Sequence, residues 1–335
     1  MNTIYIKKIY LTFLLASITF VQAEEFVAPF GLPKVPFPES NPYTKEKAEL
    51  GRRLYFDPCL SGNKEISCAT CHALERAFAD PNPVSIGILG RSGSRHAPTV
   101  INAAYHRLQF WDGRSASLED QAKGPIANQN EMSLSLDPEV SYAECQKRIK
   151  EQKDYLKMFK DVFGNEECNM DQVAQAIATF ERTILSGNSP YDRYKQGDKT
   201  AMTQEQINGY KVFKRVGCEN CHAEPLFTDG RFLNIGVGMD AEKPDLGRYE
   251  ITKDEKDWGA FKVPTLRECA KSYPYMHDGS QKTLEEVIDY YDKGGIANKN
   301  LHPLMKPLHL SDQDKKALKA FLEALNGEGW QHIKS

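Results

Sequence analysis

The sequence predicts a mainly α-helical protein of two domains, with long loops and little β-structure. Apolar residues recur at helical spacing in several segments, and capping-box residues precede several of these segments. Two similar cysteine-containing pentads lie about 150 residues apart, one in each helical region. The stretches between the helices are punctuated by glycine and proline and show little alternating strand pattern. One domain for each pentad is therefore expected.

The N-terminus has the pattern of an export signal. Lys7 and Lys8 precede a largely apolar stretch at residues 9–21, and residues 21–23 (VQA) resemble a signal-peptidase site. This stretch is shorter than the roughly 20 apolar residues that cross a bilayer core. We therefore expect cleavage of a signal peptide, residues 1–23, and a periplasmic mature protein without a membrane span.

Length and charge limit the remaining possibilities. About 310 residues follow the expected cleavage site, which suits two ordinary domains. The formal net charge of -3 gives no sign of the basic patch expected of a nucleic-acid-binding protein. We expect an extended lead-in at residues 24–43, an N-terminal domain at 44–187 and a C-terminal domain at 188–335. The tail of the second domain should pack back on the first.

Six helical segments are expected from periodicity and capping signals. In residues 171–185, Val173, Ile177, Phe180 and Ile184 fall on one face. The other segments are residues 45–56, a long helix opened by the capping box Ser141/Glu144 and ending near Phe163, the helices opened by Thr203/Gln206 and Thr283/Glu286, and residues 311–325.

A weak internal repeat supports the division into two domains. The segments GRRLYF, residues 51–56, and GYKVF, residues 209–213, each precede one of the pentads. Gly187, Asn188 and Pro190 break the helical pattern between the two halves. The domain boundary is therefore expected near residues 186–190.

The two pentads have the form Cys-x-x-Cys-His and predict c-type haem. Two thiols one helical turn apart can add to the two vinyl groups of haem, and the following histidine can ligate the iron. A redox dithiol or half of a zinc site needs no histidine at the fifth position. We expect two covalently bound haems, one attached to Cys68 and Cys71 with His72 as iron ligand and one attached to Cys218 and Cys221 with His222 as iron ligand.

Four cysteines lie outside the pentads: Cys59, Cys145, Cys168 and Cys269. An even number of cysteines in an exported protein is compatible with disulfides. A helical hairpin would bring Cys145 and Cys168 together, so this pair is the preferred bridge. Free buried thiols are an equal alternative.

Further motifs resemble the bacterial di-haem cytochrome c peroxidases and the superfamily that includes the MauG-like protein-oxidising enzymes. The resemblance extends over about residues 44–325 and implies two cytochrome c-like domains. The motifs are residues 95–100 (RHAPTV), 110–114 (FWDGR), 121–126 (QAKGPI), 130–132 (NEM), 261–267 (FKVPTLR) and 274–279 (PYMHDG).

The resemblance assigns different roles to the two haems. The His72 haem would react with hydrogen peroxide, and the His222 haem would receive electrons from a small periplasmic cytochrome c or copper protein. Glu131 matches the distal carboxylate, which would act as general acid and base, and Gln121 matches the neighbouring distal amide. Phe110 and Trp111 match an aromatic pair near the active haem, with Trp111 as a candidate electron bridge. The resemblance also suggests a homodimer.

Three positions depart from the familiar peroxidase pattern. Ile88 stands where several relatives have a histidine that caps the resting peroxidatic iron, so an open haem without reductive activation is expected. The sixth ligand of the second haem would be Tyr291, where well-known peroxidases have methionine, or Met276, and Tyr291 is slightly favoured. His96 replaces an asparagine that helps to bind an interdomain Ca²⁺ in the family, and imidazole is a poor calcium ligand. Calcium thus stays an open expectation.

Three functions follow as hypotheses. The first is a periplasmic peroxidase that reduces hydrogen peroxide to water. The second is a MauG-like enzyme that oxidises side chains of a partner protein, which Tyr291 would favour. The third is an electron-transfer cytochrome without catalysis. Such a protein keeps both irons six-coordinate. Ile88, which cannot ligate iron, and the expected distal residues Glu131 and Gln121 argue against this function.

Overall fold

The computed structural model describes residues 26–334, so the expected signal peptide lies outside the described residues. The described chain is mainly helical, as predicted, with one two-stranded sheet. No helix in this part of the chain has the length and apolar character needed to cross a bilayer. The elements are α1 (Lys45–Phe56), α2 (Cys68–Cys71), α3 (Leu118–Ala127), α4 (Pro138–Lys150), α5 (Lys153–Phe163), α6 (Met170–Glu181), α7 (Pro190–Gln196), α8 (Gln204–Arg215), α9 (Tyr249–Thr252), α10 (Leu284–Asp292), α11 (Asp312–Glu323), β1 (Phe232–Leu233) and β2 (Phe261–Lys262), with short 3-10 turns between them.

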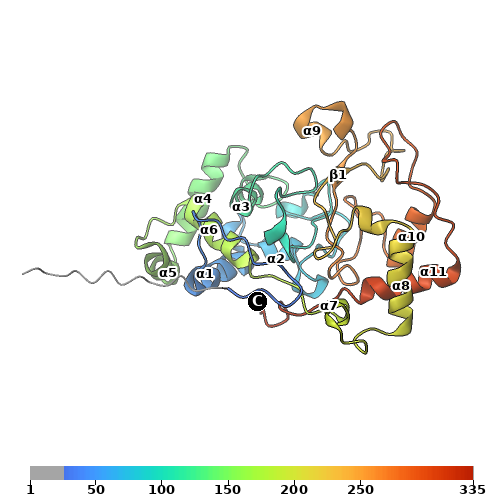
Figure 1. Cartoon of the computed structure of the whole chain (residues 1–335). Helices are drawn as coiled ribbons and strands as arrows, with labels where there is room; N and C mark the ends of the chain where they lie inside the picture. The colour runs from blue at the N-terminus through green and yellow to red at the C-terminus, as the bar shows by residue number, and fades with distance from the viewer. Residues whose placement is uncertain (1–25, 335) are drawn as a thin grey trace, which may run out of the picture.

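Two hydrophobic cores organise the molecule. Helices α1 to α6 surround the first, and helices α8, α10 and α11, on the other side of Figure 1, surround the second. We call the parts around these cores the N-terminal half and the C-terminal half. Glycine- and proline-rich loops fill the space between them, and β1 pairs antiparallel with β2 there.

The same helix crossing builds both cores. A Cβ atom on Gly51 of α1 would lie 1.9 Å from the carbonyl oxygen of Ala176 in α6. A Cβ atom on Gly209 of α8 would lie 1.9 Å from the carbonyl oxygen of Ala317 in α11. Glycine at both crossings lets the helix backbones meet closely, so the weak repeat in the sequence corresponds to a repeated packing arrangement.

The long helix predicted from Ser141 to Phe163 is wrong, because two helices occupy this region. Helix α4 begins three residues earlier, with Pro138 in its first turn and the Asp137 side chain accepting a hydrogen bond from the Glu139 backbone. Proline suits the first helical turn and aspartate suits the cap, so this pair outcompetes the predicted capping box. Ser141 is instead buried inside α4, where its hydroxyl meets that of Ser133.

The preferred disulfide is also wrong. Cys145 and Cys168 are separate free thiols, and both belong to the core of the N-terminal half. Cys59 and Cys269 are buried and free as well. The alternative of buried thiols is therefore confirmed, since these cysteines serve as small apolar core residues.

Other predicted helices are confirmed with small shifts at their ends. Helix α1 has the predicted limits, and the predicted apolar face of α6 lies in the core. Thr203 and Gln206 form the predicted reciprocal capping box of α8. Thr283 caps α10, but the carboxylate of Glu286 accepts from the backbone of Lys282 rather than from that of Thr283.

The C-terminal tail crosses back to the N-terminal half, where Figure 1 marks the end of the chain. Trp330 and Ile333 lie in the core of that half. The Trp330 ring makes an edge contact with Phe78, with centroids 6.0 Å apart. Gly187 and Glu328 pair through two backbone hydrogen bonds of 3.0 and 2.6 Å. The tail therefore ties the segment between α6 and α7 to the loop that follows the first pentad.

Candidate active site

The first pentad forms the short helix α2 and the turn after it. Ser67 precedes the helix, and its backbone N–H donates to the Thr70 hydroxyl at 3.0 Å. The backbone N–H of His72 donates to the carbonyl oxygen of Cys68 at 3.0 Å. This one-turn helix carries Cys68 and Cys71, and His72 follows directly after it, as attachment of a haem requires.

The proton on the His72 ring is fixed by two carbonyl groups. Nδ1 lies 3.0 Å from the carbonyl oxygen of Pro98 and 3.3 Å from that of Phe78. A carbonyl oxygen can only accept a hydrogen bond, so Nδ1 carries the proton and Nε2 is left to ligate iron. Burial lowers the pKa of His72, which keeps the ring neutral and suited to metal binding.

The second pentad repeats this arrangement. His222 Nδ1 donates to the carbonyl oxygen of Phe227 at 3.1 Å, and burial lowers its pKa as well. The loops that hold the two histidines also match. The Thr99 hydroxyl donates to the carbonyl oxygen of Ala77 and the Thr265 hydroxyl to that of Leu226, both at 2.6 Å. In each loop, the threonine holds the residue that precedes a phenylalanine, Phe78 in the first loop and Phe227 in the second. The carbonyl oxygens of these two phenylalanines accept from the histidines.

Buried polar atoms without partners gather near the first pentad. Among the described residues, Tyr55 Oη, Asp80 Oδ2 and Glu181 Oε2 are buried without a hydrogen bond. Burial raises the pKa of Glu181 to about 8, and the carboxylates of Glu181 and Asp80 raise the pKa values of Cys68 and Cys71 respectively. Native proteins rarely leave such groups unpaired. This region therefore fits a bound group with polar edges, such as haem.

The second pentad opens into a largely apolar cavity of about 280 Å³. Cys218, Cys221 and His222 line this cavity, together with aliphatic and aromatic residues of the C-terminal half. An apolar pocket with an imidazole and two thiols in its wall suits the flat apolar body of a haem. The residues present thus fit a covalently bound haem at both pentads.

Glu131 lies beside the first pentad. Its backbone carbonyl accepts from the backbone N–H of Ile88 at 2.8 Å, and its carboxylate accepts from the Asn128 amide at 2.6 Å. Burial raises the pKa of Glu131, although the Asn128 hydrogen bond and the nearby Arg114 charge oppose this shift. Its carboxylate also contributes to the raised pKa of the Cys71 thiol. A half-buried carboxyl group with a raised pKa can both take up and release a proton, as a general acid and base must.

The other predicted residues of this region meet on one side of α3. The Arg114 guanidinium stacks 3.4 Å from the centroid of the Phe110 ring, and Phe110 lies against Gly124 of α3. Gln121 lies on α3 one turn before Gly124 and is half-buried, without a side-chain hydrogen bond among the described residues. Sequence reasoning missed Arg114, although its place in the FWDGR motif could have indicated it.

Trp111 lies where the halves meet. It is buried, and its indole N–H donates to the carbonyl oxygen of His96 at 2.9 Å. Its own carbonyl accepts from the backbone N–H of Lys262 at 2.8 Å. Trp111 also lines the cavity of the second pentad, although it belongs to the N-terminal half.

Tyr291 and Met276 both line the cavity of the second pentad. Burial raises the pKa of Tyr291, and the thiols of Cys218 and Cys221, which line the same cavity, raise it further. Met305 and His302 line the same cavity. Sequence reasoning missed both, because they lie in a loop without a recognisable motif.

The calcium expectation concerns the junction near His96. The ring Nδ1 of His96 hydrogen-bonds to the carbonyl oxygen of Asn82 at 3.0 Å. Across residues 26–334, no cluster of three or more His, Cys, Asp or Glu side chains could hold a metal ion. Calcium can also be bound by backbone carbonyl oxygens, so calcium stays a prediction.

Comparison with known proteins gives a consistent result. Residues 45–200 match the family described as di-haem cytochrome c peroxidase. The cytochrome c551 peroxidase of Nitrosomonas europaea is 39% identical over 77% of this chain and 76% of the relative. The methylamine utilization protein MauG of Methylorubrum extorquens is 39% identical over 88% of this chain and 82% of the relative.

A solved structure agrees with these relatives. A MauG-like protein associated with microbial copper homeostasis has a TM-score of 0.80 and 32% identity, with 93% of this chain and 96% of that protein covered. This coverage includes both halves of the chain. The chain therefore belongs to the di-haem cytochrome c peroxidase family, whose MauG-like branch it also resembles, and it is an oxidoreductase with two covalently bound haem c groups.

Proposed function

We propose that this protein is a periplasmic peroxidase, which reduces hydrogen peroxide to water with electrons from a small redox protein such as a cytochrome c or a copper protein. The observation that carries this proposal is the position of Glu131, a half-buried carboxyl group held by Asn128 and packed against residues 87 and 88 of the segment that follows the first pentad. Relatives named as cytochrome c peroxidases support the same reaction.

The haem on Cys68 and Cys71 supplies the iron at which peroxide binds and its O–O bond is cleaved. Glu131 takes a proton from the inner peroxide oxygen and returns it to the departing oxygen, which leaves as water. Asn128 orients the carboxylate through its 2.6 Å hydrogen bond. Two electrons and two protons complete the reduction of one peroxide molecule to two water molecules. Gln121, on α3, is proposed as the second polar group on the distal side.

Ile88 supports an open peroxide site. Its side chain is fully buried and cannot ligate iron, and its backbone is hydrogen-bonded to that of Glu131. A Cβ atom on Gly87 would lie 2.2 Å from the carbonyl oxygen of Asn130, so this segment packs closely against the one that carries Glu131. We propose that both segments stay in place throughout turnover and that no reductive activation is required.

Electrons would arrive at the His222 haem and pass to the His72 haem. Trp111 is proposed as the bridge, because this residue of the N-terminal half lies in the wall of the second cavity. Tyr291 is proposed as the sixth ligand of the second haem, because it lines the same cavity as Cys218, Cys221 and His222. Phenolate ligation favours the ferric state, so this haem would have a lower potential than one with a methionine ligand.

Steady-state peroxide reduction by the purified di-haem protein, with a reduced small cytochrome c as donor, tests the peroxidase proposal. Turnover should rise with both substrates and consume two donor molecules for each peroxide. The ferric spin-resonance spectrum should contain one high-spin and one low-spin haem. Two low-spin haems and no turnover would leave only the electron-transfer role.

A second candidate function is MauG-like oxidation of a partner protein. Tyr291 in the second cavity is the observation that favours it, and the MauG relatives agree. Addition of peroxide without a donor separates the two functions. A two-electron-oxidised state that persists for minutes would favour protein oxidation, whereas rapid decay and efficient turnover with a donor would favour peroxide reduction.

A further inference from the structure

The segment between α6 and α7 touches equivalent positions in both haem-binding loops. Asn102 lies four residues after Pro98, whose carbonyl faces His72. Glu268 lies four residues after Pro264, which holds the corresponding position in the second loop. Both residues have left-handed backbone conformations, with φ of 62° for Asn102 and 60° for Glu268. Both side chains reach Ser186, a fully buried residue.

Asn102 holds the backbone of Ser186. The Asn102 carbonyl oxygen Oδ1 accepts from the backbone N–H of Ser186 at 3.0 Å, and its amide donates to the Ser186 carbonyl oxygen at 3.1 Å. The backbone N–H of Asn102 also donates to the carbonyl oxygen of Ile184 at 3.0 Å. Three hydrogen bonds thus attach the first haem loop to this segment.

Glu268 holds the side chain of Ser186. Its Oε1 accepts from the Ser186 hydroxyl at 2.7 Å and from the backbone N–H of Gly327 at 2.6 Å, and its other oxygen lies 3.0 Å from the Lys271 ammonium. The carboxylate is fully buried. The second haem loop is therefore attached to Ser186 and to the C-terminal tail at one point.

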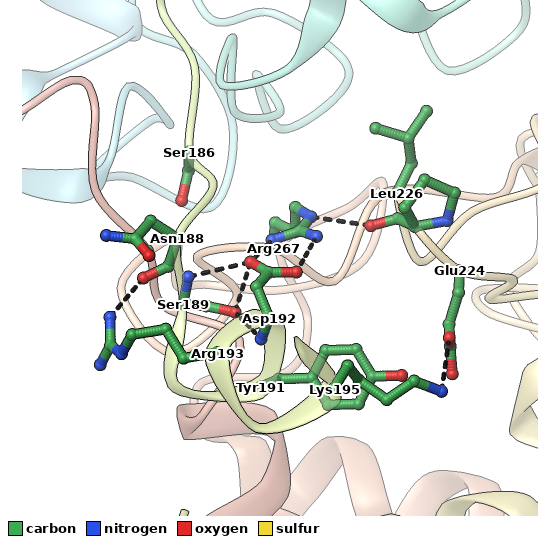
Figure 2. Close-up of polar contacts among 12 residues, drawn as sticks. Ser186, Asn188, Ser189, Tyr191, Asp192, Arg193, Lys195, Glu224, Leu226 and Arg267 are labelled. Carbon is green, nitrogen blue, oxygen red and sulfur yellow. Dashed lines mark hydrogen bonds and ion pairs between the residues drawn. The ribbon is translucent and has the colours of Figure 1, made fainter. Parts of the chain in front are cut away.

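The neighbouring ion pair fixes the second loop to the start of α7, directly after this segment. Figure 2 shows Arg267 meeting Asp192 at the start of α7, below Ser186. Arg267 makes two hydrogen bonds of 2.8 Å to the Asp192 carboxylate, and its Nε donates to the carbonyl oxygen of Pro225 at 2.9 Å. Pro225 lies two residues before Phe227, which accepts from His222. A displacement of the start of α7 would therefore be transmitted through Arg267 and Pro225 to Phe227, whose carbonyl oxygen accepts from His222.

We propose that Ser186 is a positioning residue shared by the two haems. Its backbone fixes the loop that orients His72, and its hydroxyl fixes the loop that orients His222 through Glu268. A hydrogen bond from a histidine Nδ1 to a carbonyl oxygen makes the imidazole a stronger donor to iron and stabilises the ferric state. A loop that shifts lengthens this hydrogen bond and raises the reduction potential. One buried residue thus sets the environment of both haems.

The Ser186→Ala variant of the di-haem protein tests this inference. The change removes only the hydroxyl link to Glu268 and leaves the backbone hydrogen bonds to Asn102. A spin-resonance redox titration follows the two ferric haem signals separately. We expect the potential of the His222 haem to rise and that of the His72 haem to change much less, because the hydroxyl serves the second loop and the backbone hydrogen bonds to Asn102 persist. An unchanged potential of the His222 haem, or a larger shift at the His72 haem, would overturn the inference, even if peroxide turnover were unchanged.

Two sets of variants separate positioning from simple loss of stability. Ser141→Ala removes another buried hydroxyl pair, far in sequence from both haem loops, and should leave both potentials unchanged. Glu268→Gln keeps an oxygen that can accept from Ser186 and Gly327, whereas Glu268→Met has a similar size and no such acceptor. The glutamine variant should retain the potentials of the original protein, and the methionine variant should raise mainly that of the His222 haem. Equal potentials in these two variants would contradict the shared role.

Discussion

The two halves of this protein hold their haem histidines in the same way and differ in what surrounds them. In each half, a glycine-mediated helix crossing supports the pentad, and a threonine pins the loop that faces the histidine. The N-terminal half places carboxyl groups with raised pKa values near its pentad, the half-buried Glu131 and the buried Glu181. The C-terminal half surrounds its pentad with an apolar cavity that contains Tyr291. The same backbone arrangement can thus support two different haem sites when only the surrounding side chains differ.

A second difference concerns the residue that anchors each haem-binding loop. At the position equivalent to Arg267, the N-terminal half has Ile101, which is fully buried in an apolar core. Arg267 is buried as completely but forms an ion pair with Asp192. The second loop is therefore held by a directional polar contact, and the first by apolar packing. Variants that remove these differences test whether they matter.

The largest effect is expected from Glu131→Gln. General acid-base catalysis contributes about 10²- to 10⁴-fold to a rate, so kcat/KM for peroxide should fall by about this factor while both haem spectra persist. Burial raises the pKa of Glu131, and the base form is lost as the pH falls through this raised value. The acidic limb of the pH profile should therefore lie above the ordinary pKa of glutamate and disappear in the variant.

The exposed Glu144→Gln variant is the matched control and should keep full activity. If Glu131→Gln retained the rate of the original protein, Glu131 would not be the general acid and base. The carboxyl groups would then not explain why the two haems have different roles.

Arg267→Leu should cause the largest loss of stability. Removal of one partner leaves a buried charge on Asp192, which typically costs about 3–5 kcal/mol. The change makes the second loop resemble the first, where Ile101 is apolar. Urea unfolding of the di-haem protein measures the loss. The double variant Arg267→Leu/Asp192→Asn should lose less than the sum of its parts, and strict additivity would argue against the ion pair.

The same pair predicts a pH dependence of stability. Burial raises the pKa of Asp192, but the hydrogen bonds and charge of Arg267 outweigh this effect and lower it overall. Its stabilisation is therefore complete above the ordinary pKa of aspartate and is lost as the pH falls through the lowered value. Urea unfolding between pH 5 and pH 2, roughly the relevant window, should show a decline that Arg267→Leu lacks.

Gly51→Ala and Gly209→Ala should each weaken one half. The added methyl group would overlap the backbone of the partner helix, and overpacking of this kind costs about 1–3 kcal/mol. Thermal unfolding followed at each haem should show the larger change at the haem of the altered half. Gly93→Ala, with its nearest contact at 3.4 Å, serves as a control that should change little. Equal losses at both haems would mean that the halves unfold as one unit.

The smallest effect is expected from Thr99→Val and Thr265→Val. Each change removes one hydroxyl hydrogen bond to a loop carbonyl at similar side-chain size, which costs about 1 kcal/mol. The haem of the altered half should show a small spectral shift, and the other haem should keep its spectrum. Identical spectra in both variants and in the original protein would show that the threonines do not influence the histidines.

Local patterns predicted the elements well and their limits less well. Helix α1 and the cap of α8 followed from spacing alone, because capping and periodicity act over a few residues. The split between α4 and α5 was missed, because Asp137 and Pro138 provided a stronger start than Ser141. The predicted Cys145–Cys168 bridge was wrong for another reason. Both cysteines are apolar residues of the N-terminal core, and which residues pack in that core cannot be read from their spacing in the sequence.

The sequence by itself determined that the chain carries two haems and predicted which residues attach them. Two thiols and a histidine at fixed spacing are sufficient for that chemistry, and no distant contact is needed. Only the tertiary structure brought Glu131 to Ile88, placed Trp111 in the wall of the other half's cavity and joined both haem loops at Ser186. These contacts join segments far apart in the chain, and long-range packing, which no local pattern encodes, decides them.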